Sequence, residues 1–214
     1  MVTNVLQDWT RAQMRRIARI FVKTPVTPNM LTVFGLLLNI GVGLILASGN
    51  LPLGGVLLIL AGLFDLLDGA LARITNRITQ FGGFLDSALD RYSEGVIYMG
   101  LLWYYLHDAQ HPRTLEAMLI FAVIVGSMMV SYARARATPL NVDCEVGLMA
   151  RSERIGTLAL ALILSALIPD VVTWALGLLA IGAQITAIQR IVYVYQHTDG
   201  TKVQPDTRRL KREA

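Results

Sequence analysis

Residues 52–73 read PLGGVLLILAGLFDLLDGALAR. This stretch is long and apolar enough for a membrane-spanning helix, because crossing the ~30 Å hydrocarbon layer takes roughly 20 mainly apolar residues. Two carboxylates, Asp65 and Asp68, nevertheless lie inside it. A charged side chain at mid-bilayer costs a few kcal/mol, so we expect both acids to have a function. The stretch predicts a membrane helix with a polar site in its second half.

The rest of the chain contains five further apolar runs. They cover residues 29–48, 83–106, 114–137, 155–169 and 171–195. The runs are too long for barrel strands and do not alternate with period two. Only 16% of the 214 residues are charged, whereas soluble domains carry about 25%. The single cysteine, Cys144, excludes a disulfide-stapled scaffold. We therefore predict an all-α integral membrane protein with six transmembrane helices.

The first 23 residues predict an amphipathic helix in the membrane interface, preceding the spans. Its apolar side chains recur at helical spacing, and basic side chains cover the remaining face. A solvated basic tail is the alternative; a signal peptide would need an apolar core and a cleavage site, which this segment lacks. We expect three parts: an interfacial helix over 1–23, a six-helix membrane domain over 24–196, and a polar basic tail over 197–214.

Lysine and arginine residues lie mainly on one side of the predicted spans. Five precede residue 24 and five follow residue 195, while the 74–82 loop holds one and the 138–154 loop two. The opposite connections hold only Arg113. By the positive-inside rule, both termini face the cytoplasm. The basic face suits the anionic headgroups of the cell membrane, so the net charge of +4 requires no nucleic-acid partner.

Five acids fall inside predicted spans: Asp65, Asp68, Asp86, Asp90 and Glu94. The first two are spaced i,i+3 and the next two i,i+4, so each pair shares one face of its helix. One pair lies near the end of its span and the other near the start of the next. Adjacent antiparallel helices therefore place both pairs at matching depth in the cytoplasmic half, and we expect the four carboxylates to face one small volume.

Four carboxylates in one volume require cations. Hard oxygen ligands suit Mg²⁺, Mn²⁺ or Ca²⁺, and two divalent ions would balance four charges. With Arg73 one turn away, the setting favours phosphate chemistry, in which metals bridge protein and phosphoryl oxygens. Two alternatives remain: simple ion pairs such as Asp68–Arg73 or Asp90–Arg91, and an ion or proton transporter. Against transport, no carboxylates continue toward the far face.

The acids also belong to a longer motif. It reads Asp65-Leu-Leu-Asp68-Gly69-Ala-Leu-Ala72-Arg73, then eight residues, then Gly82-x3-Asp86-x3-Asp90. This motif resembles the signature of the CDP-alcohol phosphotransferase family. Six spans with an amphipathic N-terminal helix are also similar to that family. The resemblance implies metal-dependent transfer of a phosphatidyl group from CDP-diacylglycerol to an alcohol, release of CMP, an active site on the cytoplasmic side, and a homodimer.

The resemblance also implies roles for individual acids. Asp65, Asp68 and Asp86 would ligate metal, with Asp90 near the second of two Mg²⁺ or Mn²⁺ ions. Asp90 would in addition act as the general base that takes the proton from the attacking hydroxyl.

Donor binding is implied for four further residues. Gly69 and Arg73 would hold the CDP diphosphate, Gly69 by allowing close approach. The segment Pro28-Asn29-x-Leu31-Thr32 resembles the family's nucleotide-side segment. An ordinary helix start, with Asn29 or Thr32 as the cap, is the alternative.

Arginines near the cytoplasmic ends of later spans bear on the acceptor. Residues 132–137, 151–154 and 189–190 resemble the phosphatidylinositol-phosphate synthase branch of the family, which implies that Arg134, Arg154 and Arg190 grip the phosphate of inositol 1-phosphate. Arginines that snorkel to the interface are the alternative. Glycerol 3-phosphate as acceptor and an archaetidylinositol-phosphate synthase with an ether-lipid donor also remain open.

Overall fold

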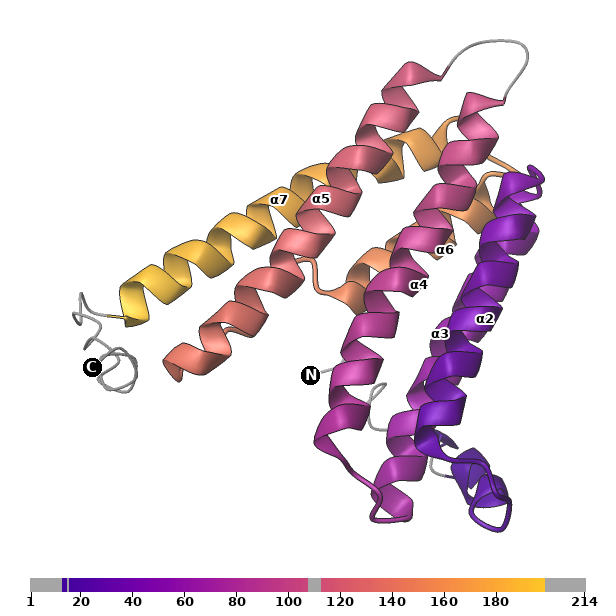
Figure 1. Ribbon diagram of the computed structural model, residues 1–214. Helices are drawn as coiled ribbons and strands as arrows, with labels where there is room; N and C mark the ends of the chain where they lie inside the picture. Colours follow the sequence, from indigo (N-terminus) through magenta and orange to yellow (C-terminus); the bar gives the residue numbers. More distant parts are fainter. Residues whose placement is uncertain (1–12, 15, 108–112, 199–214) are drawn as a thin grey trace, which may run out of the picture.

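The computed structural model describes residues 13–14, 16–107 and 113–198, and within them it is all-helical, with no strand. Most of the segment predicted as an interfacial helix and nearly all of the predicted basic tail lie outside these residues; residues 16–21 are helical. The elements are α2 (Pro28–Ala47), α3 (Leu51–Ile74), α4 (Gln80–Leu106), α5 (Thr114–Ala137), the 3-10 helix η1 (Thr138–Leu140), α6 (Arg151–Leu164) and α7 (Val171–His197) (Figure 1).

Four of these helices are long and apolar enough to cross a membrane: α2, α3, α5 with η1, and α7. α4 has 27 residues, but its first 15 include the charged residues Asp86, Asp90, Arg91 and Glu94. α6 has 14 residues, which corresponds to about 21 Å at 1.5 Å per residue. Each predicted apolar run therefore has its helix, and the bounds are displaced most for the fifth.

The fifth predicted run, 155–169, was misplaced. The helix there begins four residues earlier, at Arg151, and ends at Leu164. Its first turn is closed by the Arg154 amide, which donates to the Ala150 carbonyl at 3.1 Å. Arg151 and Arg154, expected in a loop, thus lie on a helix that packs against its neighbours, and this changes what their side chains can reach.

Side-chain caps begin α2 and α4. The Thr27 hydroxyl accepts from the Met30 amide at the start of α2, and the Thr79 hydroxyl accepts from the Gly82 amide at the start of α4. Such caps satisfy amides that have no partner within the helix. Because Thr27 caps α2, neither Asn29 nor Thr32 does so, and the capping alternative for these two residues is wrong.

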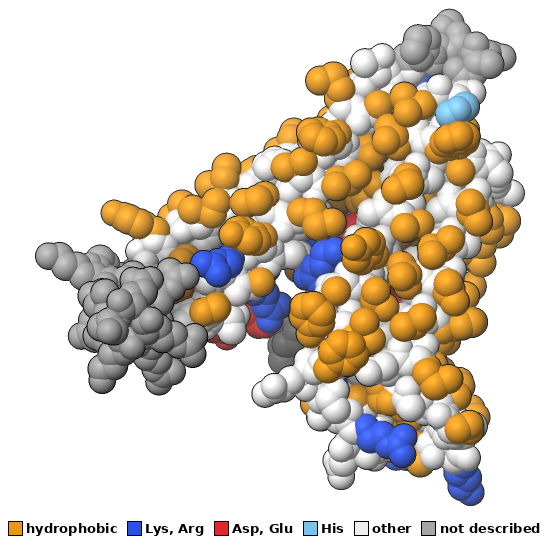
Figure 2. All heavy atoms as spheres, viewed as in Figure 1, with side chains coloured by type: hydrophobic (Ala, Val, Ile, Leu, Met, Phe, Trp, Pro, Cys, Tyr) orange, Lys and Arg blue, Asp and Glu red, His pale blue; other side chains and the backbone are white. Residues whose placement is uncertain are grey.

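The core is apolar and draws on all six α-helices. α2 packs against α3 and α4, α5 packs against α7, and α6 contacts both α3 and α7. The fully buried core includes Leu46, Leu58, Leu101, Ile120, Leu158 and Leu176. Large apolar side chains also cover much of the outer surface (Figure 2), which fits a molecule whose helices face lipid.

Glycines let α2 and α4 approach closely. A Cβ atom on Gly100 would lie 2.1 Å from the Gly43 carbonyl oxygen, and one on Gly43 would lie 2.8 Å from the Val96 carbonyl oxygen. Both obstacles are backbone atoms, which cannot swing aside as a flexible side chain can. The contact fixes α4, and therefore its acids, relative to α2.

Replacing Gly100 with Ala should destabilise the protein by about 1–3 kcal/mol, since the added methyl group forces two backbones apart. Gly95→Ala is the matched control on the same helix, because nothing lies within 4 Å of its added Cβ. Thermal unfolding of the purified protein in detergent measures both. Equal unfolding midpoints for the two variants would contradict the assigned contact.

Candidate active site

The ends of α3 and α4 bring the four signature aspartates to one place. Asp65 and Asp68 of α3 and Asp86 and Asp90 of α4 line a cavity of about 520 Å³. A smaller cavity of about 250 Å³ shares Asp68 and Asp86 and extends toward the start of α2. The i,i+3 and i,i+4 spacings thus place all four carboxylates beside shared space.

Asp68 accepts hydrogen bonds on both of its carboxylate oxygens. The Thr32 hydroxyl donates to its Oδ2 at 2.7 Å, and the Gly69 amide donates to its Oδ1. The Asp68 side chain is buried, so these donors replace water as its partners. Thr32 therefore connects α2 directly to the acidic cluster.

Arg151 is a site residue that sequence reasoning missed. Its Nη1 lies 2.9 Å from Asp90 Oδ1, and its Nη2 lies 3.2 Å from Asp65 Oδ2. One guanidinium from the first turn of α6 therefore joins an acid of α3 to an acid of α4. The Asp90–Arg91 pair considered as an alternative is also present, at the longer distance of 3.8 Å.

Gly35 is a second missed residue. A Cβ atom on Gly35 would lie 2.7 Å from Asp65 Oδ1. The neighbouring Asn39 lines the larger cavity, and its side-chain amide donates to the Gly35 carbonyl at 2.9 Å. The signal in the sequence is the spacing of Thr32, Gly35 and Asn39 at i, i+3 and i+7, which places them on one face of α2.

The four residues predicted to hold the donor lie together. Asn29, Thr32, Gly69 and Arg73 all line the smaller cavity. A Cβ atom on Gly69 would lie 3.6 Å from the terminal nitrogens of Arg73, in ordinary contact. The guanidinium of Arg73 thus lies over Gly69 at the junction of the two cavities.

The three arginines predicted for the acceptor are not equivalent. Arg134 is 54% exposed, pairs with Glu145, and lines a polar cavity of about 340 Å³ with Thr138 and Asp143. Arg190 is buried instead. Its Nε and Nη1 donate to the carbonyl groups of Val146 and Val130 at 2.9 and 2.7 Å.

Arg154 is more deeply enclosed, with 1% of its side chain exposed. Its Nε and Nη2 donate to the two carboxylate oxygens of Glu94 at 2.9 Å, while Ser127 Oγ and the Met149 carbonyl accept two further bonds. Arg154 therefore has its guanidinium occupied by Glu94 and does not line the polar cavity that contains Arg134. The physical reason is Glu94, whose buried carboxylate requires this partner.

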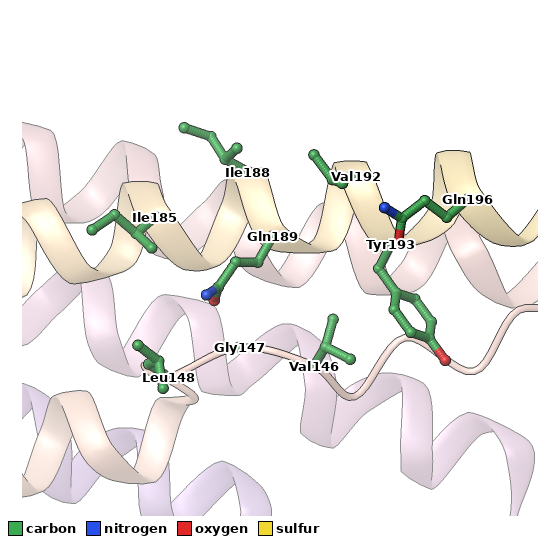
Figure 3. A pocket seen from close by; sticks show the side chains of 9 residues that line it. All are labelled: Val146, Gly147, Leu148, Ile185, Ile188, Gln189, Val192, Tyr193 and Gln196. Carbon is green, nitrogen blue, oxygen red and sulfur yellow. The ribbon is translucent and has the colours of Figure 1, made fainter.

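A further cavity, of about 500 Å³, lies between α7 and the chain over 146–148 (Figure 3). Its walls are mainly apolar, including Leu148, Ile188 and Val192, with the amides of Gln189 and Gln196 among them. It contains none of the predicted site residues.

The donor atoms around the acids suit a hard divalent cation, since they are carboxylate oxygens. Among the described residues, however, no three acidic, histidine or cysteine side chains are grouped closely enough to enclose an ion. Arg151 takes one oxygen each of Asp65 and Asp90. A metal at these acids would therefore require them to exchange a guanidinium for the ion.

Comparison with known proteins identifies the class. Residues 25–188 match the CDP-alcohol phosphatidyltransferase family, to which this chain belongs. It is an enzyme, a membrane transferase of phospholipid biosynthesis, so the transporter alternative is replaced. The archaetidylinositol phosphate synthase of Methanothermobacter thermautotrophicus is 36% identical over 190 residues, covering 86% of this chain and 93% of that protein. The phosphatidylinositol phosphate synthase of Corynebacterium glutamicum is 33% identical over 178 residues, covering 82% and 81%.

Solved structures agree with this assignment. The phosphatidylinositol phosphate synthase of Mycobacterium tuberculosis with CDP-DAG bound superposes with a TM-score of 0.79 at 30% identity, covering 85% of this chain and 93% of that chain. The same enzyme in complex with manganese and citrate also gives a TM-score of 0.79, covering 85% and 88%.

Replacing Gly35 with Ala should turn the Asp65 carboxylate away, because the added Cβ would lie 2.7 Å from its Oδ1 and that side chain can rotate. If Asp65 binds metal, affinity for Mn²⁺ should then fall by about tenfold, the equivalent of about 1.4 kcal/mol. Titration of Mn²⁺ into the purified protein, followed by electron paramagnetic resonance, measures it. Gly41→Ala on the same helix is the control, with nothing within 4 Å of the added atom. Equal affinities in both variants would remove Gly35 from the site.

Replacing Arg154 with Ala leaves Glu94 buried and unpaired, which costs about 3–5 kcal/mol in such pairs. Glu145→Gln at the exposed Arg134–Glu145 pair is the control and should cost at most about 1 kcal/mol. Thermal unfolding compares them. An Arg154→Ala protein as stable as the control would show that Arg154 is not the interior partner of Glu94.

Proposed function

We propose that this enzyme transfers the phosphatidyl group of CDP-diacylglycerol to the hydroxyl of a phosphorylated alcohol, inositol 1-phosphate, and releases CMP. The observation that carries the proposal is the meeting of four aspartates and Arg73 beside two joined cavities. The names of the relatives support the acceptor class. Phosphatidylinositol and archaetidylinositol phosphate synthases both appear among relatives at 31–36% identity.

The proposed setting is the cell membrane, with six spans, both termini and the active site on the cytoplasmic side. In this arrangement residues 1–23 form the interfacial helix, 24–196 the membrane domain and 197–214 the basic tail. The distribution of lysine and arginine supports the orientation. The short α6, with 14 residues, also fits this orientation, because its polar first turn then stays near the headgroups beside the acids.

Two joined cavities offer complementary places for the two halves of the donor. The smaller one, with Asn29, Thr32 and Arg77, is rich in polar groups and suits the cytidine nucleotide. Apolar walls in the larger one, formed by Ile59 and Leu63 among others, suit the diacylglycerol. The diphosphate then lies at the junction, where Gly69 permits close approach and Arg73 supplies a guanidinium for its oxygens.

Asp65, Asp68, Asp86 and Asp90 are the proposed ligands of two Mg²⁺ or Mn²⁺ ions. Bound there, such ions would neutralise the diphosphate and polarise the phosphoryl group. Thr32 keeps Asp68 oriented by its hydrogen bond. Asp90, 21% exposed at the cavity, takes the proton from the acceptor hydroxyl, and Arg73 stabilises the charge that develops on departing CMP.

For the acceptor, Arg134 is the best placed of the three arginines, because it is the exposed one. Arg154 and Arg190 would contribute to phosphate binding only by exchanging their bonds to Glu94 and to backbone carbonyls. The proposed enzyme acts as a homodimer, as the family resemblance implies. Glycerol 3-phosphate and an ether-lipid donor are the competing substrates.

An acceptor panel tests the proposal. Purified enzyme with labelled CDP-diacylglycerol and Mn²⁺ is given inositol 1-phosphate, inositol, glycerol 3-phosphate or serine, and CMP release is measured. We expect release with inositol 1-phosphate, and loss of about 10²-fold or more in Asp90→Asn, since general bases contribute 10²–10⁴-fold. The Asp170→Asn variant is the control, because Asp170 is exposed, pairs with Arg113 and lines neither of the two site cavities. CMP release only with glycerol 3-phosphate would overturn the proposed acceptor, and no release with any of the four acceptors would overturn the proposed function.

A further inference from the structure

The position of Arg151 suggests a role that the transfer reaction itself does not require. Its guanidinium reaches Asp90 on α4 and Asp65 on α3. All three side chains are largely buried, with exposures of 30% for Arg151, 21% for Asp90 and 19% for Asp65. Ion pairs at such sites are screened far less than those on the surface.

The first turn of α6 presents Arg151 in a fixed position. One turn further along, Arg154 is locked to Glu94, which lies one turn beyond Asp90 on α4. Two ion pairs therefore connect the same faces of α4 and α6: Arg151 with Asp90, and Arg154 with Glu94. The second pair is buried and keeps the Arg151 backbone beside the acids even when the Arg151 side chain moves.

A divalent ion and this guanidinium need the same atoms. Arg151 uses Asp90 Oδ1 and Asp65 Oδ2, and an ion at these acids would take carboxylate oxygens as ligands. Both cations draw on the same negative charge and repel each other, so an ion at these oxygens weakens the Arg151 contacts, and those contacts weaken the binding of the ion. No other described guanidinium makes an ion pair with acids of both α3 and α4.

We propose that Arg151 competes with the metal ions for Asp65 and Asp90, and so sets the metal concentration at which the site assembles. This inference rests on the proposed function, because it takes the aspartates to be metal ligands. Arg151 neutralises the acids until an ion displaces it, and the displaced side chain remains in the larger cavity, which it also lines.

Mn²⁺ affinity of the full-length protein in detergent tests the competition. Free Mn²⁺ is followed by electron paramagnetic resonance during titration of wild type, Arg151→Gln and Arg151→Lys. Removing the competitor should tighten binding in Arg151→Gln by about tenfold, or about 1.4 kcal/mol. Arg151→Lys should lie between the two, because lysine keeps the charge but lacks the planar fork that holds two carboxylates.

Arg91→Gln is the matched control for charge alone. Arg91 lies 3.8 Å from Asp90 and is similarly exposed, at 33%. Replacing Arg91 removes one positive charge near Asp90 but leaves the Arg151 bridge between Asp65 and Asp90 in place. This substitution should tighten Mn²⁺ binding by less than about threefold, as expected for a weak ion pair. An equal gain in Arg91→Gln and Arg151→Gln would reduce the effect to net charge and overturn the proposal.

The unmodified protein provides a second measurement that does not depend on a variant folding. Phenylglyoxal labels arginine, and the Arg151 peptide is quantified by mass spectrometry with EDTA or with Mn²⁺. Displacement predicts faster labelling of Arg151 with Mn²⁺, and an unchanged or slower rate would contradict it. Unchanged or weaker Mn²⁺ binding in Arg151→Gln defeats this inference alone, whereas a wild type that binds no Mn²⁺ defeats the metal site of the proposed function.

Discussion

Negative charge held among apolar helices is the constraint on which this structure depends. Asp65, Asp68, Asp86 and Asp90 cannot remain unbalanced beside one cavity, because carboxylates away from water are stable only with cations or hydrogen-bond donors nearby. Arg151 supplies part of the positive charge that balances these acids. The negative charge that it leaves unbalanced points to divalent ions, and so to the metal-dependent chemistry of the family.

Close backbone approach makes the cluster possible. Gly43 and Gly100 let α2 and α4 touch, and Gly35 gives Asp65 room beside α2. Thr32 then reaches Asp68 from the same helix. α2 carries no acid of its own, yet its small and polar residues decide where the acids of the other two helices lie. The fold and the site therefore share one set of contacts.

The acidic cluster could be predicted from the sequence, but its arginine partners could not. Spacing along two adjacent helices is a local property, so it indicated that the acids of both helices line one cavity. Arg154 depends on Glu94, which lies 60 residues away and on another helix. Nothing in the local sequence distinguishes an arginine that faces an acceptor from one that neutralises a buried acid. The start of α6 at Arg151 was also missed, because polar residues open the helix. The contacts of Arg151 with Asp65 and Asp90 therefore could not be predicted either.

Anomalous X-ray scattering from crystals grown with Mn²⁺ tests the central claim most directly, because it locates the ions without assuming a mechanism. We predict two Mn²⁺ peaks between α3 and α4, within coordinating distance of oxygens from Asp65, Asp68, Asp86 and Asp90, with the Arg151 guanidinium moved away from Asp65 and Asp90. Mn²⁺ bound elsewhere, with Arg151 still bridging these two acids, would contradict the account.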